Sequence, residues 1–242
     1  MSENTWFEHH NIVMEDTILL TYYFATKSSY ENVRREVRRD DQPSISDETI
    51  ADMYTFSKEV CMLAFDSLLE NRGPLGGPNK IVEIDEMKFG KRKYQKDRLV
   101  EGTWIFGAIQ VDTGELRLEI CPENRRTSEA LFPLIKKHIL PGTIIHSDCW
   151  RAYDCLKDHG YNHSSVNHEE HFVDPETGVN TQMIESQWRP LRARLQRGGI
   201  PKADLDYHLC EYLWHREIEK GDLNPFASLI SSIVKMYSGI GE

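Results

Sequence analysis

The chain begins with apolar side chains that recur at the spacing of a helix. Residues 5–39 form one such stretch, and a second follows a polar break at residues 40–43. Ser46 can cap the second helix, which we expect to run towards Leu69. Two helices joined by a short break are typical of a helix-turn-helix module that reads DNA, and they are also typical of a plain helical bundle that packs on another domain.

The pattern changes after a stretch rich in Gly and Pro at residues 71–79, which predicts a domain boundary. Runs of β-branched and apolar residues then predict strands, and amphipathic runs predict helices. We expect strands at 81–90, 102–111, 116–121, 143–147 and 161–167, and helices at 128–140, 150–159, 181–195, 204–219 and 225–238.

This order, three strands followed by strands that alternate with helices, predicts an α/β layered domain. It is also the order of the ribonuclease H-like fold, in which acids from the first strand, the fourth strand and a late helix converge. We therefore expect a small helical module at residues 1–74. Residues 75–242 would form a ribonuclease H-like core, a mixed five-stranded sheet with flanking helices, together with the C-terminal helices.

Composition narrows the class of protein. No apolar run reaches the roughly 18–20 residues of a membrane helix, and the N-terminus lacks the pattern of a secretory signal. The five cysteines include no Cys-x-x-Cys pair, which argues against a zinc ribbon or a disulfide framework and fits a reducing compartment. The net charge of -10 discourages nucleic-acid binding in general, but binding depends on local patches.

Three acids occupy places from which they could act on a phosphodiester together. Asp85 lies on the first expected strand of the sheet, Asp148 follows the fourth, and Glu185 lies on the late helix. Two-metal catalysis uses Mg²⁺ ions about 3.5–4 Å apart, held by hard oxygen ligands on rigid elements. Each acid also has a structural interpretation, because Asp148 could cap the next helix and Glu185 could face water.

The segment IVEIDE at residues 81–86 places three acids in one apolar strand. Strand alternation puts Glu83 and Asp85 on one face and Glu86 on the other. Periodicity therefore separates Glu86 from Asp85, but it does not choose between Glu83 and Asp85 as the reactive acid.

Four long motifs resemble those of the transposases of Merlin elements and of bacterial insertion-sequence transposases with an ISXO2-like domain. They are GGPNKIVEIDEMKFGKRKY, EGTWIFGAI, IIHSDCWRAY and VNHEEHFVDPETGVNTQMIESQW, and the resemblance covers about residues 75–220. It implies a ribonuclease H-like DDE core in which Asp85, Asp148 and Glu185 are the catalytic residues and the metal ligands. Two Mg²⁺ ions would be held there, with Mn²⁺ as a substitute. The resemblance also selects Asp85 over Glu83.

The function implied by the resemblance is that of a DNA transposase, which cuts DNA and joins the freed 3′-hydroxyl to target DNA. Its partners would be double-stranded DNA, at transposon ends and target, and further copies of itself, with no membrane. It would work in the nucleus of a eukaryotic host, or otherwise in the cytoplasm. Many relatives carry a zinc ribbon that this chain lacks, so the recognition of ends stays open. The alternative is a host-retained, non-transposing protein that binds DNA or chromatin.

Two basic runs border the proposed acids, one after Asp85 and one after Glu185. Phosphate contacts supply most of the sequence-independent affinity for DNA, although a run of charge is also typical of a solvated surface. The residues that we assign to DNA are Lys88, Lys91, Arg92, Lys93, Arg189, Arg192, Arg194 and Arg197.

Three further features are less specific. Trp188 is expected in the core, with base stacking as the alternative. His163, His168 and His171 form a loose set that could bind zinc, but loop histidines are common and no cysteine lies nearby. We expect a supporting role near the metals for His168 or Asn180.

Overall fold

The computed structural model describes residues 12–37, 45–90, 102–148, 151–166, 173–175, 177–195 and 200–238. The chain divides into two compact units. Met1–Leu68 and Cys210–Glu242 form the first, and Leu69–Leu209 form the second. The contacts thus group the C-terminal helices with the N-terminal ones, whereas the sequence pattern placed them with the sheet.

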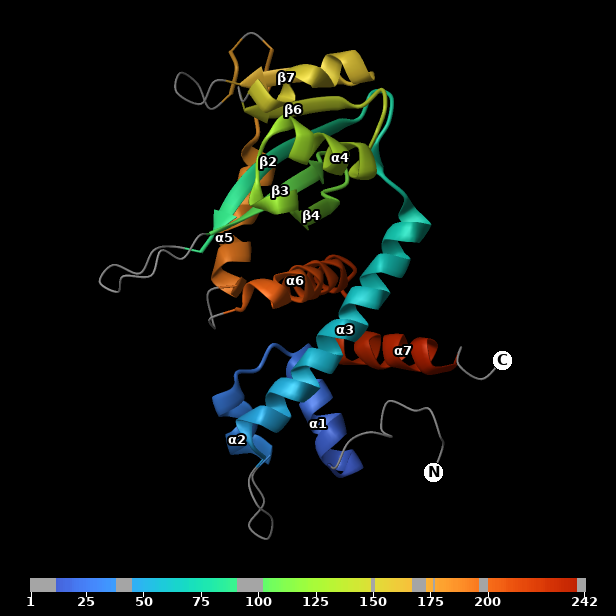
Figure 1. Ribbon diagram of the computed structural model, residues 1–242. Coiled ribbons are helices and arrows are strands. Elements are labelled where there is room, and N and C mark those ends of the chain that lie inside the picture. The colour runs from blue at the N-terminus through green and yellow to red at the C-terminus, as the bar shows by residue number, and fades with distance from the viewer. Residues whose placement is uncertain are drawn as a thin grey trace, which may run out of the picture. The chain divides into compact units, whose positions relative to one another are not determined.

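The first unit is helical (Figure 1). Its elements are α1 (Met14–Ala25), α2 (Tyr30–Val37), most of α3 (Asp47–Arg72), most of α6 (Leu205–Lys220) and α7 (Pro225–Ser238). The last residues of α3 and the first of α6 belong to the second unit. Its core includes Leu20, Phe24, Ile50, Trp214 and Leu229.

The helix expected at 5–39 is two helices, α1 and α2, within the residues described. Lys27 has a left-handed backbone (φ 60), and the Tyr54 hydroxyl donates to the Ser28 carbonyl at 3.1 Å, so the chain turns between them. The expected cap of α3 is confirmed, because the backbone N–H of Thr49 donates to Ser46 Oγ at 3.1 Å.

The second unit contains the mixed five-stranded sheet. Its strands are β2 (Ile81–Phe89), β3 (Thr103–Gln110), β4 (Leu116–Ile120), β6 (Ile144–Asp148) and β7 (Asn162–Val166). They lie in the order β4-β3-β2-β6-β7, with β2, β3 and β4 antiparallel and β2, β6 and β7 parallel. The expected ribonuclease H-like arrangement is therefore confirmed (Figure 1).

Helices cover the two faces of this sheet. Core residues of α4 (Ser128–His138) and of the 3-10 helix η2 (Arg151–His159) pack with Val82 and Ile84 of β2. The alternate residues of β2 contact α5 (Gln182–Leu195) instead. The helix expected at 128–140 ends at His138, because Ile139 is extended (φ -130, ψ 128) and enters a short strand, β5 (Ile139–Leu140), that pairs with β1 (Leu75–Gly76).

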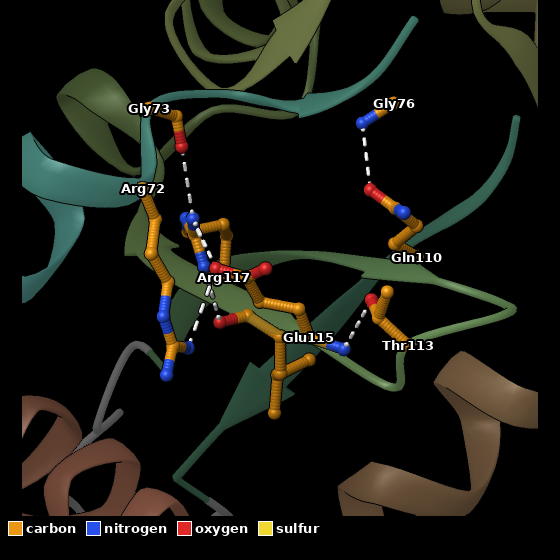
Figure 2. Close-up of polar contacts among 8 residues, drawn as sticks. Arg72, Gly73, Gly76, Gln110, Thr113, Glu115 and Arg117 are labelled. Carbon is orange, nitrogen blue, oxygen red and sulfur yellow. Dashed lines mark hydrogen bonds and ion pairs between the residues drawn. The ribbon is translucent and has the colours of Figure 1, made fainter.

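Figure 2 shows the polar contacts that join the chain entering the sheet to the β3–β4 hairpin. Arg117, only 3% exposed, donates to the Gly73 carbonyl at 3.1 Å and pairs with Glu115 at 2.7 Å. Arg72 pairs with the same carboxylate at 3.5 Å, and Gln110 Oε1 accepts the Gly76 N–H at 2.8 Å. Because buried charge is costly without partners, this network fixes the start of the unit against the hairpin.

None of the described helices combines the length and the apolar character that crossing a membrane requires.

Candidate active site

The parallel pairing of β2 with β6 brings two of the three predicted acids to neighbouring strands. The ladder between the two strands ends with Glu83 paired to His146, and Asp85 and Asp148 each follow that pair by two residues on their own strand. Asp148 is the last residue of β6, where it pairs with Val166 of β7. Paired residues of parallel strands point to the same face, so both carboxylates belong to the face that α5 covers.

Asp85 is held by the helix that packs over it. The indole Nε1–H of Trp188 donates to Asp85 Oδ2 at 2.7 Å. Burial raises the pKa of Asp85 to about 6, the bond from Trp188 opposes that rise, and the charges of Asp148 and Glu185 add to it. Trp188 is 8% exposed, so its expected core position is confirmed, and its contact with Asp85 is a feature that the hydrophobic pattern did not reveal.

Gly107 of β3 makes room for that indole. It pairs with Asp85 in the β2–β3 register. A Cβ atom at this position would lie 2.4 Å from Cη2 of Trp188, so the indole would have to move. A glycine inside a strand often marks such a close approach. The second glycine of the motif GTWIFGAI, which is Gly107, was therefore the sequence feature that indicated this packing.

Glu83 binds the start of the same helix. Its Oε2 accepts the backbone N–H of Ile184 at 2.9 Å, and its side chain lies in the protein interior. Burial raises the pKa of Glu83, whereas hydrogen bonds from the backbone of Ile184 and Met183 lower it. These amides belong to the first turn of α5, which has no intrahelical partners for its N–H groups. Glu83 therefore anchors the N-terminus of α5, a role that strand periodicity left open.

Glu185, the third predicted acid, lies one turn into α5. Its Oε1 accepts a hydrogen bond from Thr181 Oγ1 at 2.7 Å. Its charge contributes to the raised pKa of both Asp85 and Glu83. Asp85 thus lies within electrostatic reach of both Asp148 and Glu185. A surface depression of about 550 Å³ on α5 is lined by Glu185, Trp188, Arg189, Arg192 and Ala193.

Glu86 faces away from α5, as strand alternation predicts. Its side chain is 2% exposed, and its Oε1 has no hydrogen-bond partner among the described residues. Arg126 Nη1 lies 3.9 Å from Oε2. Burial raises the pKa of Glu86 to about 8, the charges of Asp85 and Asp148 add to the rise, and Arg126 opposes it. Glu86, the third acid of IVEIDE, is therefore buried on the face of the sheet opposite the candidate site.

The described basic residues assigned to DNA lie on both faces of the sheet. Arg189 and Arg192 are exposed on α5, and Arg194 is half-buried. Lys88 is exposed on β2 and follows Met87, whose Sδ lies 2.9 Å from Nε of Arg192. Because neighbours on a strand point to opposite faces, Lys88 belongs to the face of Glu86. Four other residues of this assignment fall outside the described residues: Lys91, Arg92, Lys93 and Arg197.

The remaining candidates are only partly described. Asn180 lies just before α5, where its Oδ1 accepts the backbone N–H of Gln182 at 3.3 Å. His163 pairs with Ser147 Oγ at 2.8 Å, and burial lowers its pKa. His168 and His171 lie outside the described residues, so the predicted supporting role of His168 and the loose histidine set stay predictions.

The donor atoms at this site suit a hard divalent cation. Carboxylate oxygens are the ligands that Mg²⁺ prefers, and the charge repulsion that raises the pKa of Asp85 is the kind that a bound cation relieves. Within the described part of the chain, no group of three or more His, Cys, Asp or Glu side chains is already arranged to hold a metal ion. The residue types therefore fit the ion, whereas the side chains as placed are engaged with Trp188 and Thr181.

Comparison with known proteins gives four findings. Residues 74–214 match the ISXO2-like transposase domain. An "Uncharacterized transposase-like protein" from Haemophilus influenzae is 28% identical over 109 residues, which cover 45% of this chain and 85% of that protein. The catalytic core domain of HTLV-2 integrase, in complex with magnesium, is 16% identical with a TM-score of 0.36, over 57% of this chain and 86% of that one. The catalytic core of BIV integrase is 16% identical with a TM-score of 0.37, over 65% of this chain and 97% of that one.

Proposed function

Because the chain belongs to the family with an ISXO2-like transposase domain, we propose that it is a DNA transposase that cuts phosphodiester bonds and joins 3′-hydroxyl ends to target DNA. The observation that carries this proposal is the electrostatic interaction of Asp85 with two other acids. Asp85, Asp148 and Glu185 come from separate elements, and the latter two both raise the pKa of Asp85. Acids on rigid elements that repel one another are typical of a site that binds cations.

Asp85, Asp148 and Glu185 are the residues that would hold two Mg²⁺ ions, or Mn²⁺ in their place. When bound, such ions activate the attacking oxygen and stabilise the leaving one. The protein supplies the orientation. Trp188 orients Asp85 through the hydrogen bond from its indole N–H. Glu83 binds the backbone N–H of Ile184, the residue directly before Glu185, and so holds the start of α5 in place. Positioning of this kind matters because in-line attack tolerates little displacement.

The surface beside Glu185 supports DNA as the substrate. Glu185, Arg189 and Arg192 recur at i, i+4 and i+7, so they share one face of α5. All three line the depression of about 550 Å³. Arginine side chains at such a place can bind the phosphates that flank a bond held at the acids. We propose the same role for further basic residues, namely Lys88, Lys91, Arg92, Lys93, Arg194 and Arg197. The DNA would be double-stranded, and a homo-oligomer of the protein would bind it.

Strand cleavage by single-residue variants tests the proposal. Asp85→Asn, Asp148→Asn and Glu185→Gln should each abolish cleavage of duplex oligonucleotides in Mg²⁺ or Mn²⁺ while DNA binding is kept. Asp112→Asn is the matched control, because Asp112 is an exposed acid that pairs with Lys80 at 2.6 Å. If the three variants cut like the parent, the site is misassigned. A parent that binds DNA but cuts none in either metal would favour the host-retained DNA-binding protein instead.

A further inference from the structure

A hydroxyl and an imidazole lie behind Asp148, on the face of the sheet opposite α5. Ser147 precedes Asp148 on β6 and is fully buried. Its Oγ donates to the backbone carbonyl of Asp148 at 2.7 Å and lies 2.8 Å from Nε2 of His163 on β7. Because neighbours on a strand point to opposite faces, Ser147 reaches Asp148 through the backbone and leaves its carboxylate on the side of α5.

The number of available hydrogens fixes the direction of both bonds. A serine hydroxyl carries one hydrogen and can accept others with its lone pairs. Because that hydrogen goes to the Asp148 carbonyl, the contact with His163 requires the ring to donate from Nε2. The result is a hydrogen-bond relay that runs from the His163 N–H through the Ser147 hydroxyl to the carbonyl of Asp148.

The imidazole of this relay is itself held in place. His163 pairs with Ile145 in the ladder between β6 and β7, which sets it on the same face as Ser147. The ring of Tyr153, from η2, makes a T-shaped contact with the imidazole, with centroids 6.2 Å apart. Tyr153 is buried, and its hydroxyl has no hydrogen-bond partner among the described residues. Tyr153 thus contacts His163 through its ring and not through its hydroxyl.

The relay restricts the backbone torsion that orients Asp148. The direction of a carbonyl follows ψ of its own residue, because the peptide unit is planar. The rotamers open to a side chain in turn depend on φ and ψ. Asp148 is the last residue of β6, and the ends of strands open more readily than their centres. A bond that holds its carbonyl therefore limits where the carboxylate can point.

We propose that Ser147 and His163 are positioning residues, which act through the Asp148 carbonyl to aim its carboxylate at the bound metal ions. This inference rests on the proposed function, in which Asp148 is a metal ligand. Groups that orient metal ligands typically change metal affinity or activity by about 10–100-fold. The proposal also gives His163 a role that is separate from zinc binding.

The affinity of the full chain for Mn²⁺, measured by calorimetry without DNA, tests the proposal. Ser147→Ala removes both bonds and should raise the Kd for Mn²⁺ by about 10-fold or more. His163→Leu should raise it by a similar factor, and His163→Gln should recover part of the loss because it keeps an N–H donor. In the Ser147→Ala background, His163→Leu should cause no further change, since the relay is already broken. Fully additive losses would overturn the proposal, because His163 would then not act through Ser147.

Two controls separate positioning from stability. Ile145 is fully buried on the same strand and the same face as Ser147, so Ile145→Val should lower stability and leave the Kd for Mn²⁺ unchanged. Tyr153→Phe keeps the ring that contacts His163 and should also bind Mn²⁺ like the parent. If Ile145→Val weakens Mn²⁺ binding as much as Ser147→Ala does, the effect is one of the fold and the proposal fails.

Nitrogen NMR of the histidine rings in EDTA tests the relay without metal. Burial lowers the pKa of His163, so the ring is neutral at pH 8. The parent should show His163 protonated at Nε2, with that proton protected from solvent exchange, and Ser147→Ala should lose the protection. A parent ring protonated at Nδ1 and not at Nε2 would refute this inference, whatever the protein cuts. A parent that shows the Nε2 proton and the expected Mn²⁺ affinities but cuts no DNA would refute the proposed function alone.

Discussion

The indole Nε1–H of Trp188 donates to Oδ2 of Asp85 at 2.7 Å and so joins the helix of Glu185 to the strand of Asp85. Trp188 lies three residues after Glu185 on α5, on the side of the helix that packs on the sheet. The bond therefore links two of the three predicted acids through one rigid element. Its contribution can be separated from the packing of the ring, because phenylalanine keeps an aromatic ring but has no donor.

Trp188→Phe should lower the affinity for Mn²⁺ strongly and the free energy of unfolding only moderately. A hydrogen bond to a charged group contributes about 1.5–3 kcal/mol, so we expect the free energy of unfolding to fall by about that amount or less. Groups that orient metal ligands typically affect metal affinity or activity by about 10–100-fold. The Mn²⁺ concentration that half-saturates binding, measured by calorimetry, should rise within that range.

Trp214→Phe is the control for this variant, because Trp214 lies in the core of the helical unit. It should lower stability without changing the Mn²⁺ requirement. An unchanged Mn²⁺ affinity in Trp188→Phe would show that the bond does not orient Asp85.

Gly107→Ala should displace the indole from Asp85. The added Cβ would lie 2.4 Å from Cη2 of Trp188, and overpacking of this kind typically costs about 1–3 kcal/mol. Chemical denaturation measures the loss. The double variant Gly107→Ala with Trp188→Phe should be more stable than the sum of the single losses predicts, because the smaller ring relieves the clash. Strict additivity would mean that the two residues do not compete for this space.

Glu83→Ala should loosen the start of α5. Loss of a side chain that caps a helix N-terminus costs about 0.5–2 kcal/mol, and the Ile184 N–H would lose its 2.9 Å acceptor. We expect faster amide hydrogen exchange at Met183 and Ile184 and a lower free energy of unfolding. Glu83→Gln retains an oxygen acceptor and should lose less. If both variants exchange these amides at the rate of the parent, Glu83 does not stabilise the start of α5.

Glu86→Gln should change how stability depends on pH. Burial raises the pKa of Glu86 from 4.5 to about 8, so between these values the unfolded chain releases a proton that the folded protein keeps. Stability from this group is therefore complete below pH 4.5 and declines as the pH rises towards 8, by up to about 1.4 kcal/mol per pH unit. Glutamine cannot titrate, so the variant's unfolding free energy relative to the parent should rise by about 3–4 kcal/mol from pH 5 to pH 8.

Denaturation in EDTA at several pH values measures this difference without metal binding. A difference that stays constant across the window would show that Glu86 ionises alike in the folded and unfolded chain.

The sheet could be predicted because most of its strands carry apolar residues in runs or in alternation and all are short, and the ends of each expected strand lie within one residue of the observed ends. The strand β7 (NHSSV) is the exception, because it is largely polar. The turn at Lys27 was not predicted, because the left-handed residue is a lysine and not the glycine that usually marks the end of a helix. Backbone N–H groups of Lys27 and Ser28 donate to the carbonyls of Phe24 and Tyr23 there. The grouping of α6 and α7 with the N-terminal helices depends on contacts between distant segments, which local periodicity does not record.

The faces of IVEIDE followed from alternation, and the structure places Glu83 and Asp85 towards α5 and Glu86 away from it. Alternation could not distinguish the roles of Glu83 and Asp85, since both are acids on one face. Their different roles arise from α5, whose first turn meets Glu83 and whose Trp188 meets Asp85. The position of Gly107 was visible in the sequence, but only the packed indole explains it.

Anomalous scattering from Mn²⁺-soaked crystals would show whether Asp85, Asp148 and Glu185 form one metal-binding catalytic site. We expect a Mn²⁺ peak between the carboxylates of Asp85 and Asp148 in the parent and no such peak in Asp85→Asn. Crystals that bind Mn²⁺ elsewhere but show no peak between these two carboxylates would refute the metal site.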